Sequence, residues 1–208
     1  MEKSSVSKAT LGRLPQYLEF LRSLPPNKVP RISATSIAKS LSLGEVQVRK
    51  DLAAVSGDGK PKLGHSTEEL IDKIEECLGY NKLTPAVLVG AGKLGMALLQ
   101  FDEFEKYGVK IAAAFDSNEQ KLKHDTKTEI LPMNQFEAFC NERKIQLGII
   151  TVGQGSAQKV CDIMIESGIT AIWNFAPCTL TVPKGILLRN ENLALSLAHL
   201  NNQLCNIN

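Results

Sequence analysis

The stretch AVLVGAGKLG, residues 86–95, joins an apolar, strand-type run to three glycines and the first residues of a helix. Its G-x-G-x-x-G spacing is typical of the turn between the first strand and the first helix of a Rossmann-type fold. In such a turn Gly90 permits the tight bend, Gly92 lets the backbone approach a pyrophosphate, and Gly95 lets the helix pack on its strand. The stretch therefore predicts a phosphate-binding loop at the centre of an α/β domain.

A second apolar strand, Val109 to Phe115, follows the first predicted helix, which runs to about Tyr107, and this strand leads into Asp116. Asp116 lies about 20 residues after Gly95, where an acid can accept hydrogen bonds from the ribose hydroxyls of a dinucleotide. The alternative is a glycine-rich turn without a ligand, followed by a solvated acid. The turn and the acid together favour a dinucleotide.

The 208 residues, 43% hydrophobic and 22% charged, are typical of a globular protein and exceed the usual length of one domain. No apolar run approaches the roughly 18 residues of a membrane span, and the N-terminal residues lack the apolar core of a signal peptide. We therefore expect a cytoplasmic protein that does not contact membranes. The five cysteines lack metal-ligand spacing, so we expect packing residues and no metal site.

Positive charge is concentrated near the N-terminus. Residues 1–65 contain 11 Lys and Arg against 5 Asp and Glu, whereas residues 83–208 contain 11 against 12. An uneven distribution of this kind predicts two domains with different partners, of which the N-terminal one binds a polyanion.

The N-terminal part has the pattern of a helix-turn-helix. A first helix from Leu11 to Leu24 is followed by a short helix capped by Ser33, a turn at 42–44, and a third helix from Glu45 to Val55. On the third helix we expect Val46, Val48, Leu52 and Val55 to face inward, and Gln47, Arg49, Lys50 and Asp51 to face outward.

Residues 56–65 then form a glycine-rich, basic loop, as expected of a wing. Helix and wing together predict binding to double-stranded DNA, with the helix in the major groove and cations on the phosphates. The alternative for each cation taken singly is a solvated surface charge. The candidate DNA-binding residues are Ser33, Ser36, Gln47, Arg49, Lys50, Lys60 and Lys62.

Strand and helix patterns alternate through the rest of the chain. An acidic amphipathic helix, Thr67–Leu78, is expected to bridge two domains, and Lys121, Lys123 and His124 are expected to face solvent in a polar loop. Further helices are predicted from Asn134 to Arg143 and from Ala157 to Ser167. With strands at Ile145–Val152 and Ala171–Asn174, this alternation predicts a doubly wound parallel sheet.

Ligands of such sheets bind at the carboxyl ends of the strands. The candidate cofactor-binding residues are therefore Gly90, Ala91, Gly92, Lys93, Leu94, Gly95, Asp116, Thr151, Val152, Gly153, Asn174, Phe175, Ala176 and Pro177.

A terminal helix from Glu191 to Asn206 places Leu193, Leu197, Leu200 and Leu204 on one face. Either this face packs on its own domain, or the helix is exchanged with a second subunit in a homodimer. We expect a DNA-binding domain at 1–82, a nucleotide-binding domain at 83–189 and a dimerisation helix at 190–208.

Along nearly its whole length the chain resembles the Rex family of redox-sensing transcriptional repressors. The matching residues are Arg13-Leu14-Pro15-x-Tyr17, Gln47–Leu52, Val89-Gly90-x-Gly92-x-Leu94-Gly95, Thr151-Val152, Ala157-Gln158 and Asn174–Pro177. The resemblance implies a homodimer with N-terminal winged-helix domains, Rossmann domains that bind NAD(H), and exchanged C-terminal helices. It also implies that NADH releases operator DNA and that NAD+ permits binding.

The chain departs from the family pattern at several positions. Phe101 stands where the family has Tyr, Gly153 where it has Pro, and Asn192 where it has an acid; the hinge run Ser-Tyr-Phe-Gly is replaced by residues 53–56, AAVS. If Arg13 pairs with that acid in the family, Asn192 would offer it only a neutral hydrogen bond. We expect nucleotide binding to persist and discrimination between NADH and NAD+ to narrow.

The leading interpretation is a repressor, not an enzyme, that senses the NADH/NAD+ ratio. A small NAD-dependent oxidoreductase is the first alternative, but it would need a proton donor beside the nicotinamide, and none of His65, His124 and His199 follows a predicted strand end. A winged-helix regulator that responds to another nucleotide, such as coenzyme A, is the second.

Overall fold

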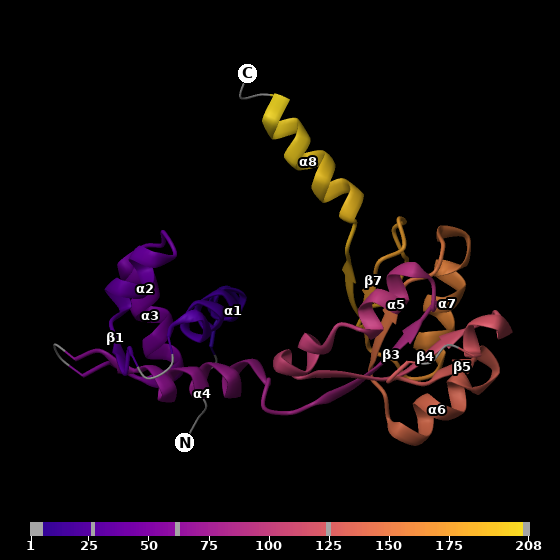
Figure 1. The fold of residues 1–208 in the computed structure, drawn as a ribbon, viewed down its shortest axis with the longest axis horizontal. Helices are drawn as coiled ribbons and strands as arrows, with labels where there is room; N and C mark the ends of the chain where they lie inside the picture. Colours follow the sequence, from indigo (N-terminus) through magenta and orange to yellow (C-terminus); the bar gives the residue numbers. More distant parts are fainter. Residues whose placement is uncertain (1–5, 26–27, 61–62, 124–125, 206–208) are drawn as a thin grey trace. The chain divides into compact units, whose positions relative to one another are not determined.

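A computed structural model describes residues 6–25, 28–60, 63–123 and 126–205. The chain divides into two compact units, residues 1–82 and 83–208 (Figure 1).

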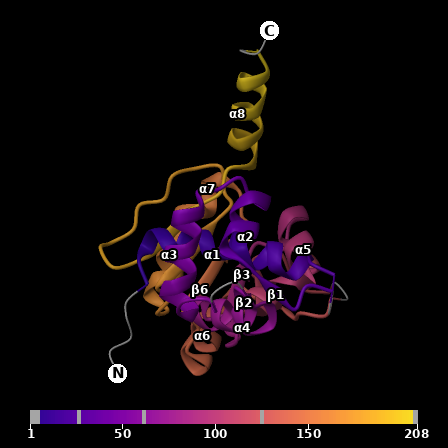
Figure 2. The same ribbon diagram turned by 90° about the vertical axis from the view of Figure 1, so that its left-hand side faces the viewer.

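The first unit is mainly helical. Its elements in chain order are α1 (Lys8–Ser23), β1 (Arg31–Ile32), α2 (Ala34–Ser40), α3 (Glu45–Ser56), β2 (His65–Ser66) and α4 (Thr67–Leu78). Strand β1 pairs antiparallel with β2, and α4 packs against α1 and α3 (Figure 2). The arrangement is a winged helix, as predicted, and it shows that α4 is an integral part of the first unit, where the sequence predicted a helix between domains.

The core of this unit comes from the apolar stripes of its helices. Leu14 and Leu18 of α1, Leu52 of α3, and Leu70 and Ile74 of α4 are all at most 1% exposed. Helix α1 begins earlier than predicted, because the hydroxyl of Ser7 caps it by accepting from the Thr10 amide.

Two predictions for α3 are wrong. Val46 is 66% exposed, whereas Asp51 is only 3% exposed. Val46 lies two residues before the buried Val48 and therefore on the opposite side of the helix. Asp51 lies beside the buried Leu52, and α1 supplies polar partners for its carboxylate.

The second unit contains a six-stranded parallel sheet in the order β5-β4-β3-β6-β7-β8. The strands are β3 (Thr84–Val89), β4 (Val109–Asp116), β5 (Ile130–Pro132), β6 (Leu147–Ile150), β7 (Ala171–Asn174) and β8 (Leu187–Asn190). The helices are α5 (Lys93–Leu99), α6 (Phe136–Arg143), α7 (Gln154–Glu166) and α8 (Leu193–Cys205), with 3-10 segments η1 (Asp102–Tyr107), η2 (Glu119–Lys123) and η3 (Met133–Gln135).

Helices cover both faces of this sheet, as the doubly wound prediction requires. Helices α6 and α7 pack on one face, where Phe136 and Met164 join Val87 and Phe115 in the core. Helix α5 covers the other face, around Leu88. The register pairs Val89 at the end of β3 with neighbours at the ends of β4 and β6, so the carboxyl ends of these three strands meet.

The sequence prediction missed both edge strands, β5 and β8, and it extended the first helix of this unit too far. Helix α5 ends at Leu99, and the chain continues as the 3-10 segment η1. Strand β5 has three residues and β8 has four, too few for a periodic pattern to distinguish them from loops.

The apolar face of α8 is not covered. None of its residues is buried, and Leu193, Leu197, Leu200 and Leu204 are each more than half exposed. Among the described residues, no helix is both long enough and apolar enough to cross a membrane.

Candidate functional sites

In the glycine turn after β3, an added side chain would clash with neighbouring atoms at Gly90 and Gly95 but not at Gly92. Gly90 has a φ of +108°, and a side chain there would come within 2.8 Å of the Thr151 backbone. A Cβ at Gly95 would lie 2.0 Å from the Gly90 carbonyl oxygen, so only glycine lets α5 approach its own turn. At Gly92 a Cβ would meet nothing within 4 Å. The loop thus leaves space on one side of its backbone, as a bound phosphate requires.

That space opens into a cleft of about 510 Å³ at the carboxyl ends of β3, β4 and β6. Of the candidate cofactor-binding residues, six line it: Gly90, Gly92, Asp116, Thr151, Val152 and Gly153. The cleft occupies the position at which open α/β sheets bind their ligands.

Asp116 is 7% exposed, and its carboxylate holds the loop together. Its Oδ2 accepts from the Ala91 amide at 2.8 Å and from Lys121 Nζ at 2.9 Å, and Oδ1 accepts from the Asn118 amide at 2.9 Å. Burial alone would raise the pKa of Asp116, but the hydrogen bonds from Lys121, Asn118 and Ala91 outweigh it and lower the pKa below its ordinary value. Lys121 therefore does not simply face solvent as predicted, because it forms an ion pair with the proposed ribose acceptor.

Thr151 connects β6 to the glycine turn. Its hydroxyl donates to the Gly90 carbonyl at 2.7 Å and lies 3.1 Å from the Val89 carbonyl. These contacts fix the separation of the two strand ends on either side of the cleft.

The other candidates lie around the cleft and do not line it. Ala91 acts through its amide on Asp116, and Lys93 and Leu94 lie in the first turn of α5. Asn174 is fully buried: its side-chain oxygen accepts from the Ala176 amide at 2.9 Å and its Nδ2 donates to Asn190 Oδ1 at 2.9 Å. Asn174 therefore shapes the 174–178 loop, which includes Phe175, Ala176 and Pro177.

Sequence reasoning missed several lining residues, namely Ser117, Lys121, Met133, Ser156, Lys159, Val160 and Ile163. Four of them, at positions 156, 159, 160 and 163, repeat at helical spacing on α7. That helix starts directly after the Thr151-Val152-Gly153 strand end, so the spacing could have identified them. Lys121 and Lys159 add positive charge to a cleft whose expected ligand carries phosphates.

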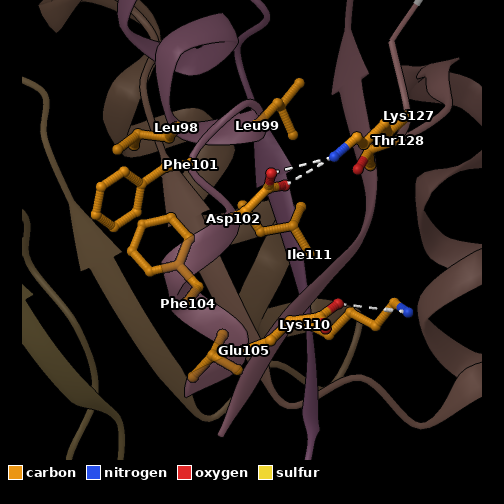
Figure 3. A pocket seen from close by; sticks show the side chains of 11 residues that line it. Leu98, Leu99, Phe101, Asp102, Phe104, Glu105, Lys110, Ile111, Lys127 and Thr128 are labelled. Carbon is orange, nitrogen blue, oxygen red and sulfur yellow. Dashed lines mark hydrogen bonds and ion pairs between the residues drawn. The ribbon is translucent and has the colours of Figure 1, made fainter. Parts of the chain in front are cut away.

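A second cavity, of about 360 Å³, lies between η1, β4 and the segment before β5 (Figure 3). Phe101, 49% exposed, lines it beside Phe104, with ring centroids 5.0 Å apart. Lys127 and Asp102 form an ion pair at its rim, with Nζ and Oδ2 3.1 Å apart. Phe101, which stands where the family has Tyr, lines this second cavity within its own chain and not the glycine-loop cleft.

The candidate DNA-binding residues lie on α2, α3 and the wing of the first unit. Gln47, Arg49 and Lys50 are exposed on α3, and a groove of about 400 Å³ is lined by Ser33, Arg49 and Lys60 together. Ser33 caps α2 by accepting from the Ser36 amide at 3.0 Å. Lys62 lies outside the described residues, as do His124 and the side chain of Lys123.

The wing is held at its base by two side chains that the sequence did not single out. Arg31 donates to the carbonyls of Leu63 and Gly64, at 3.1 and 2.7 Å. His65 Nδ1 lies 3.1 Å from the Ser56 hydroxyl. Burial is the main cause that lowers the pKa of the imidazole, and the positive charge of the nearby Arg31 lowers it further. These contacts tie the wing to β1 and to the end of α3.

A buried polar cluster joins α1 to α3. Asp51 accepts from Arg13 Nε at 2.7 Å, Arg13 Nη2 at 2.8 Å, the Tyr17 hydroxyl at 2.8 Å and the Thr10 hydroxyl at 2.9 Å. Burial would raise the pKa of Asp51, but these donors lower it, and burial raises the pKa of Tyr17 to about 12. Within the first unit, the partner of Arg13 is therefore Asp51.

Comparison with known proteins covers nearly the whole chain. Residues 81–178 match the family described as "CoA binding domain", and residues 5–53 match "Putative DNA-binding protein N-terminus". The redox-sensing transcriptional repressor Rex of Treponema denticola is 38% identical over 202 residues, 96% of each chain. The Rex protein of Clostridium beijerinckii is 37% identical over 95% of this chain and 94% of its own.

Solved structures agree with these relatives. A crystal structure of RSP in complex with β-NAD+ and operator DNA has a TM-score of 0.88 at 33% identity, covering 97% of this chain and 93% of that one. A structure of RSP with β-NADH has a TM-score of 0.84 at the same identity, covering 97% and 95%. The chain belongs to the Rex family of redox-sensing transcriptional repressors.

Proposed function

We propose that this protein is a DNA-binding repressor that binds NAD(H) in the glycine-loop cleft and leaves its operator when NADH is bound. The observation that carries the proposal is the similarity, over 97% of this chain, to a structure with both β-NAD+ and operator DNA. The cleft at the glycine loop and the groove lined by Ser33, Arg49 and Lys60 are the candidate sites for the two ligands.

Named residues support the nucleotide site. Gly92 provides open backbone for a pyrophosphate, and Asp116 Oδ1 has capacity to accept from a ribose hydroxyl.

The sensor works by differential affinity. A nucleotide shifts the equilibrium between a DNA-competent and a DNA-incompetent arrangement only if it binds one of them more tightly. We propose that NADH favours an arrangement in which two α3 helices no longer match their half-sites on the duplex.

Two copies of α3 require a dimer, and α8 is the proposed exchange element. Its four leucines are uncovered on their own chain, and an uncovered apolar face of this size favours an apolar partner. Truncation before Asn190 is expected to yield monomers by sedimentation and to weaken DNA binding. A truncated protein that remains dimeric would exclude the exchange.

The deciding experiment is a DNA titration at several salt concentrations with NAD+, NADH, coenzyme A or no nucleotide. We expect release by NADH only. Release by coenzyme A alone would favour the other-nucleotide alternative, which the family match over residues 81–178 makes worth testing. Turnover of a hydride acceptor would favour an oxidoreductase.

Variants of α3 test the DNA face in the same titration. Arg49→Ala and Lys50→Ala are each expected to weaken DNA binding by about 1–3 kcal/mol without changing nucleotide affinity. Lys73→Ala, which removes an exposed cation from α4, is the matched control and should change DNA affinity little. Unchanged DNA affinity in both α3 variants would contradict the assignment.

We propose that the departures from the family pattern reduce the difference between the effects of NADH and NAD+ on DNA binding. Gly153 has a φ of −64°, the value that proline imposes, so Gly153→Pro is compatible with the fold. Phe101→Tyr, Gly153→Pro and Asn192→Asp together should sharpen NADH-induced release. An unchanged response in the triple variant would show that these positions do not set the discrimination.

A further inference from the structure

The imidazole of His65 lies at the base of the wing, and its two nitrogens have different surroundings. Nδ1 lies 3.1 Å from the hydroxyl of Ser56, the last residue of α3. Nε2 lies against the wing backbone, since a Cβ on Gly59 would come within 2.9 Å of it. Among the described residues none accepts a hydrogen bond from Nε2, and no unpaired side-chain nitrogen among them is buried, so Nε2 is accessible to solvent.

The ring can take up a proton without losing its contact with α3. An imidazolium donates from both nitrogens, and a hydroxyl can donate one hydrogen bond while it accepts another. Nδ1 can therefore donate to the Ser56 hydroxyl, which donates to the Leu52 carbonyl at 3.1 Å. Protonation adds a positive charge and an outward N–H at Nε2, and it leaves the base of the wing intact.

In the protein without DNA the ring is neutral at neutral pH. Burial is the main cause that lowers the pKa of His65 below its ordinary value of about 6.5, and the positive charge of Arg31 on β1 adds to it. The negative charge of Asp58 in the wing acts in the opposite direction and is outweighed. The other charged residues that line the two cavities beside His65 are Arg49 of α3, Lys60 of the wing, and Glu69 and Lys73 of α4.

His65 also lines the groove of about 400 Å³ in which the candidate DNA-binding residues Ser33, Arg49 and Lys60 meet. A duplex held by these residues brings phosphates to the same groove. A negative charge within about 4–6 Å favours the charged form of an imidazole. The ring therefore meets an environment that disfavours its charge in the free protein and one that favours it in the complex.

We propose that His65 takes up a proton when the protein binds DNA, so that the imidazolium contacts a phosphate of the duplex and DNA affinity rises as the pH falls. The inference rests on the proposed DNA binding. It makes the proton a second signal for DNA release, separate from the nucleotide cleft of the second unit.

Linkage gives the direction and the size of the effect. The added affinity is fully present below the pKa of His65 in the free protein, and it is lost as the pH rises through the higher pKa in the complex. A phosphate that raises the pKa by about one unit increases affinity by about tenfold for each first unit bound to DNA.

The test uses the full-length protein without nucleotide and a duplex that it selects from a randomised DNA library. Fluorescence anisotropy at constant ionic strength measures affinity from about pH 5.5 to about pH 8, where we expect a rise of about tenfold per bound unit toward low pH. Calorimetry at about pH 6.5, in buffers that differ in ionisation enthalpy, counts the protons taken up on binding.

Substitution of His65 identifies the proton acceptor. It is the one histidine in residues 1–82. His65→Asn keeps a group that can hydrogen-bond to Ser56 but cannot be protonated, so both the proton uptake and the pH dependence should disappear. His124→Asn, which removes a histidine of the second unit, is the matched control and should retain both. A purely structural role for His65 would weaken binding by the same factor at every pH and leave proton uptake unchanged.

A direct measurement decides the matter if His65→Asn does not fold. Nuclear magnetic resonance of the native protein follows the His65 ring through a pH titration, with and without the duplex. The pKa should be higher in the complex, and an equal or lower pKa there would refute proton uptake at this residue.

The outcomes separate the two proposals. A native protein that selects no duplex at any pH overturns the DNA-binding function itself. A native protein that selects a duplex but binds it without proton uptake, or whose uptake persists in His65→Asn, overturns only the inference about His65.

Discussion

Each unit of the protein contains a nearly buried aspartate, and the two have opposite surroundings. Asp51, 3% exposed, accepts four hydrogen bonds from α1 side chains, the number that a carboxylate can accept. Asp116, 7% exposed, accepts three from the described residues and lines a cleft. One carboxylate is saturated by its own protein, and the other retains capacity for a ligand.

The difference shows how to distinguish a structural acid from a binding acid when both are buried and both have a lowered pKa. Burial and the direction of the pKa shift are shared. What separates them is the number of acceptor positions already occupied and whether the group opens onto a cavity. The following experiments would break or sharpen this contrast.

The largest expected effect is on the stability of the first unit, through the Asp51 cluster. Asp51→Asn should lower the free energy of unfolding of the first unit by about 2–4 kcal/mol, because Arg13, Tyr17 and Thr10 lose a shared anionic acceptor. Denaturant unfolding followed by circular dichroism measures it. Asp72→Asn, an exposed aspartate on α4, is the matched control and should cost less than about 0.5 kcal/mol. Equal costs for the two variants would contradict a structural role for the Asp51 cluster.

A substitution in the glycine-loop cleft should change nucleotide affinity and leave folding unchanged. Gly92→Val should reduce NADH affinity by at least about a hundredfold, or about 2.7 kcal/mol, because a branched side chain would occupy the space left for the pyrophosphate. Calorimetry on the folded variant measures it. Gly155→Val, at another glycine with open space around it, should bind normally. Retained affinity in Gly92→Val would mean that this loop is not the phosphate site.

A smaller effect is expected in cofactor selectivity. Asp116 should favour NAD(H) over NADP(H), and Lys121 should reduce that preference because its ammonium partly neutralises the carboxylate. Lys121→Met should therefore increase the ratio of NADH to NADPH affinity by about tenfold. Lys127→Met, which breaks an exposed ion pair elsewhere, serves as the control. An unchanged ratio would show that Lys121 does not face the 2′ position.

The smallest effect is a difference in acid sensitivity. Because both aspartates have a folded-state pKa below the unfolded value of about 3.9, their stabilisation is present above that pH and is lost as the pH falls through the lowered folded-state pKa. Asp51→Asn should reduce the loss of stability at low pH in the first unit, and Asp116→Asn should reduce it in the second. The only tryptophan of the sequence, Trp173, lies in the second unit and reports its unfolding by fluorescence. If each variant altered the other unit's acid sensitivity instead, the two carboxylates would not be independent.

Local spacing was sufficient to predict most of the architecture. The helix-turn-helix, the glycine turn and strand β7 follow from residues close together in the chain, and the positions of Gly90, Gly95 and Asp116 followed from the same motif. The short edge strands were missed because three or four residues carry no periodic signal.

Partners from distant elements were not predictable in the same way. Asp51 was assigned to the outside of α3 together with Arg49 and Lys50, but its burial depends on α1, about 40 residues earlier. Lys121 was assigned to solvent because it lies in a polar loop, and only the fold of η2 brings it onto Asp116.

The sequence by itself therefore determined most of the elements and the place of the glycine-loop cleft on the sheet, because periodicity and glycine spacing act within a few residues. The tertiary structure alone decided which charges are satisfied and which remain available, because a hydrogen bond depends on donors that folding brings within about 3 Å. That physical difference separates Asp51, whose acceptor positions are all occupied, from Asp116, which keeps one for a ligand.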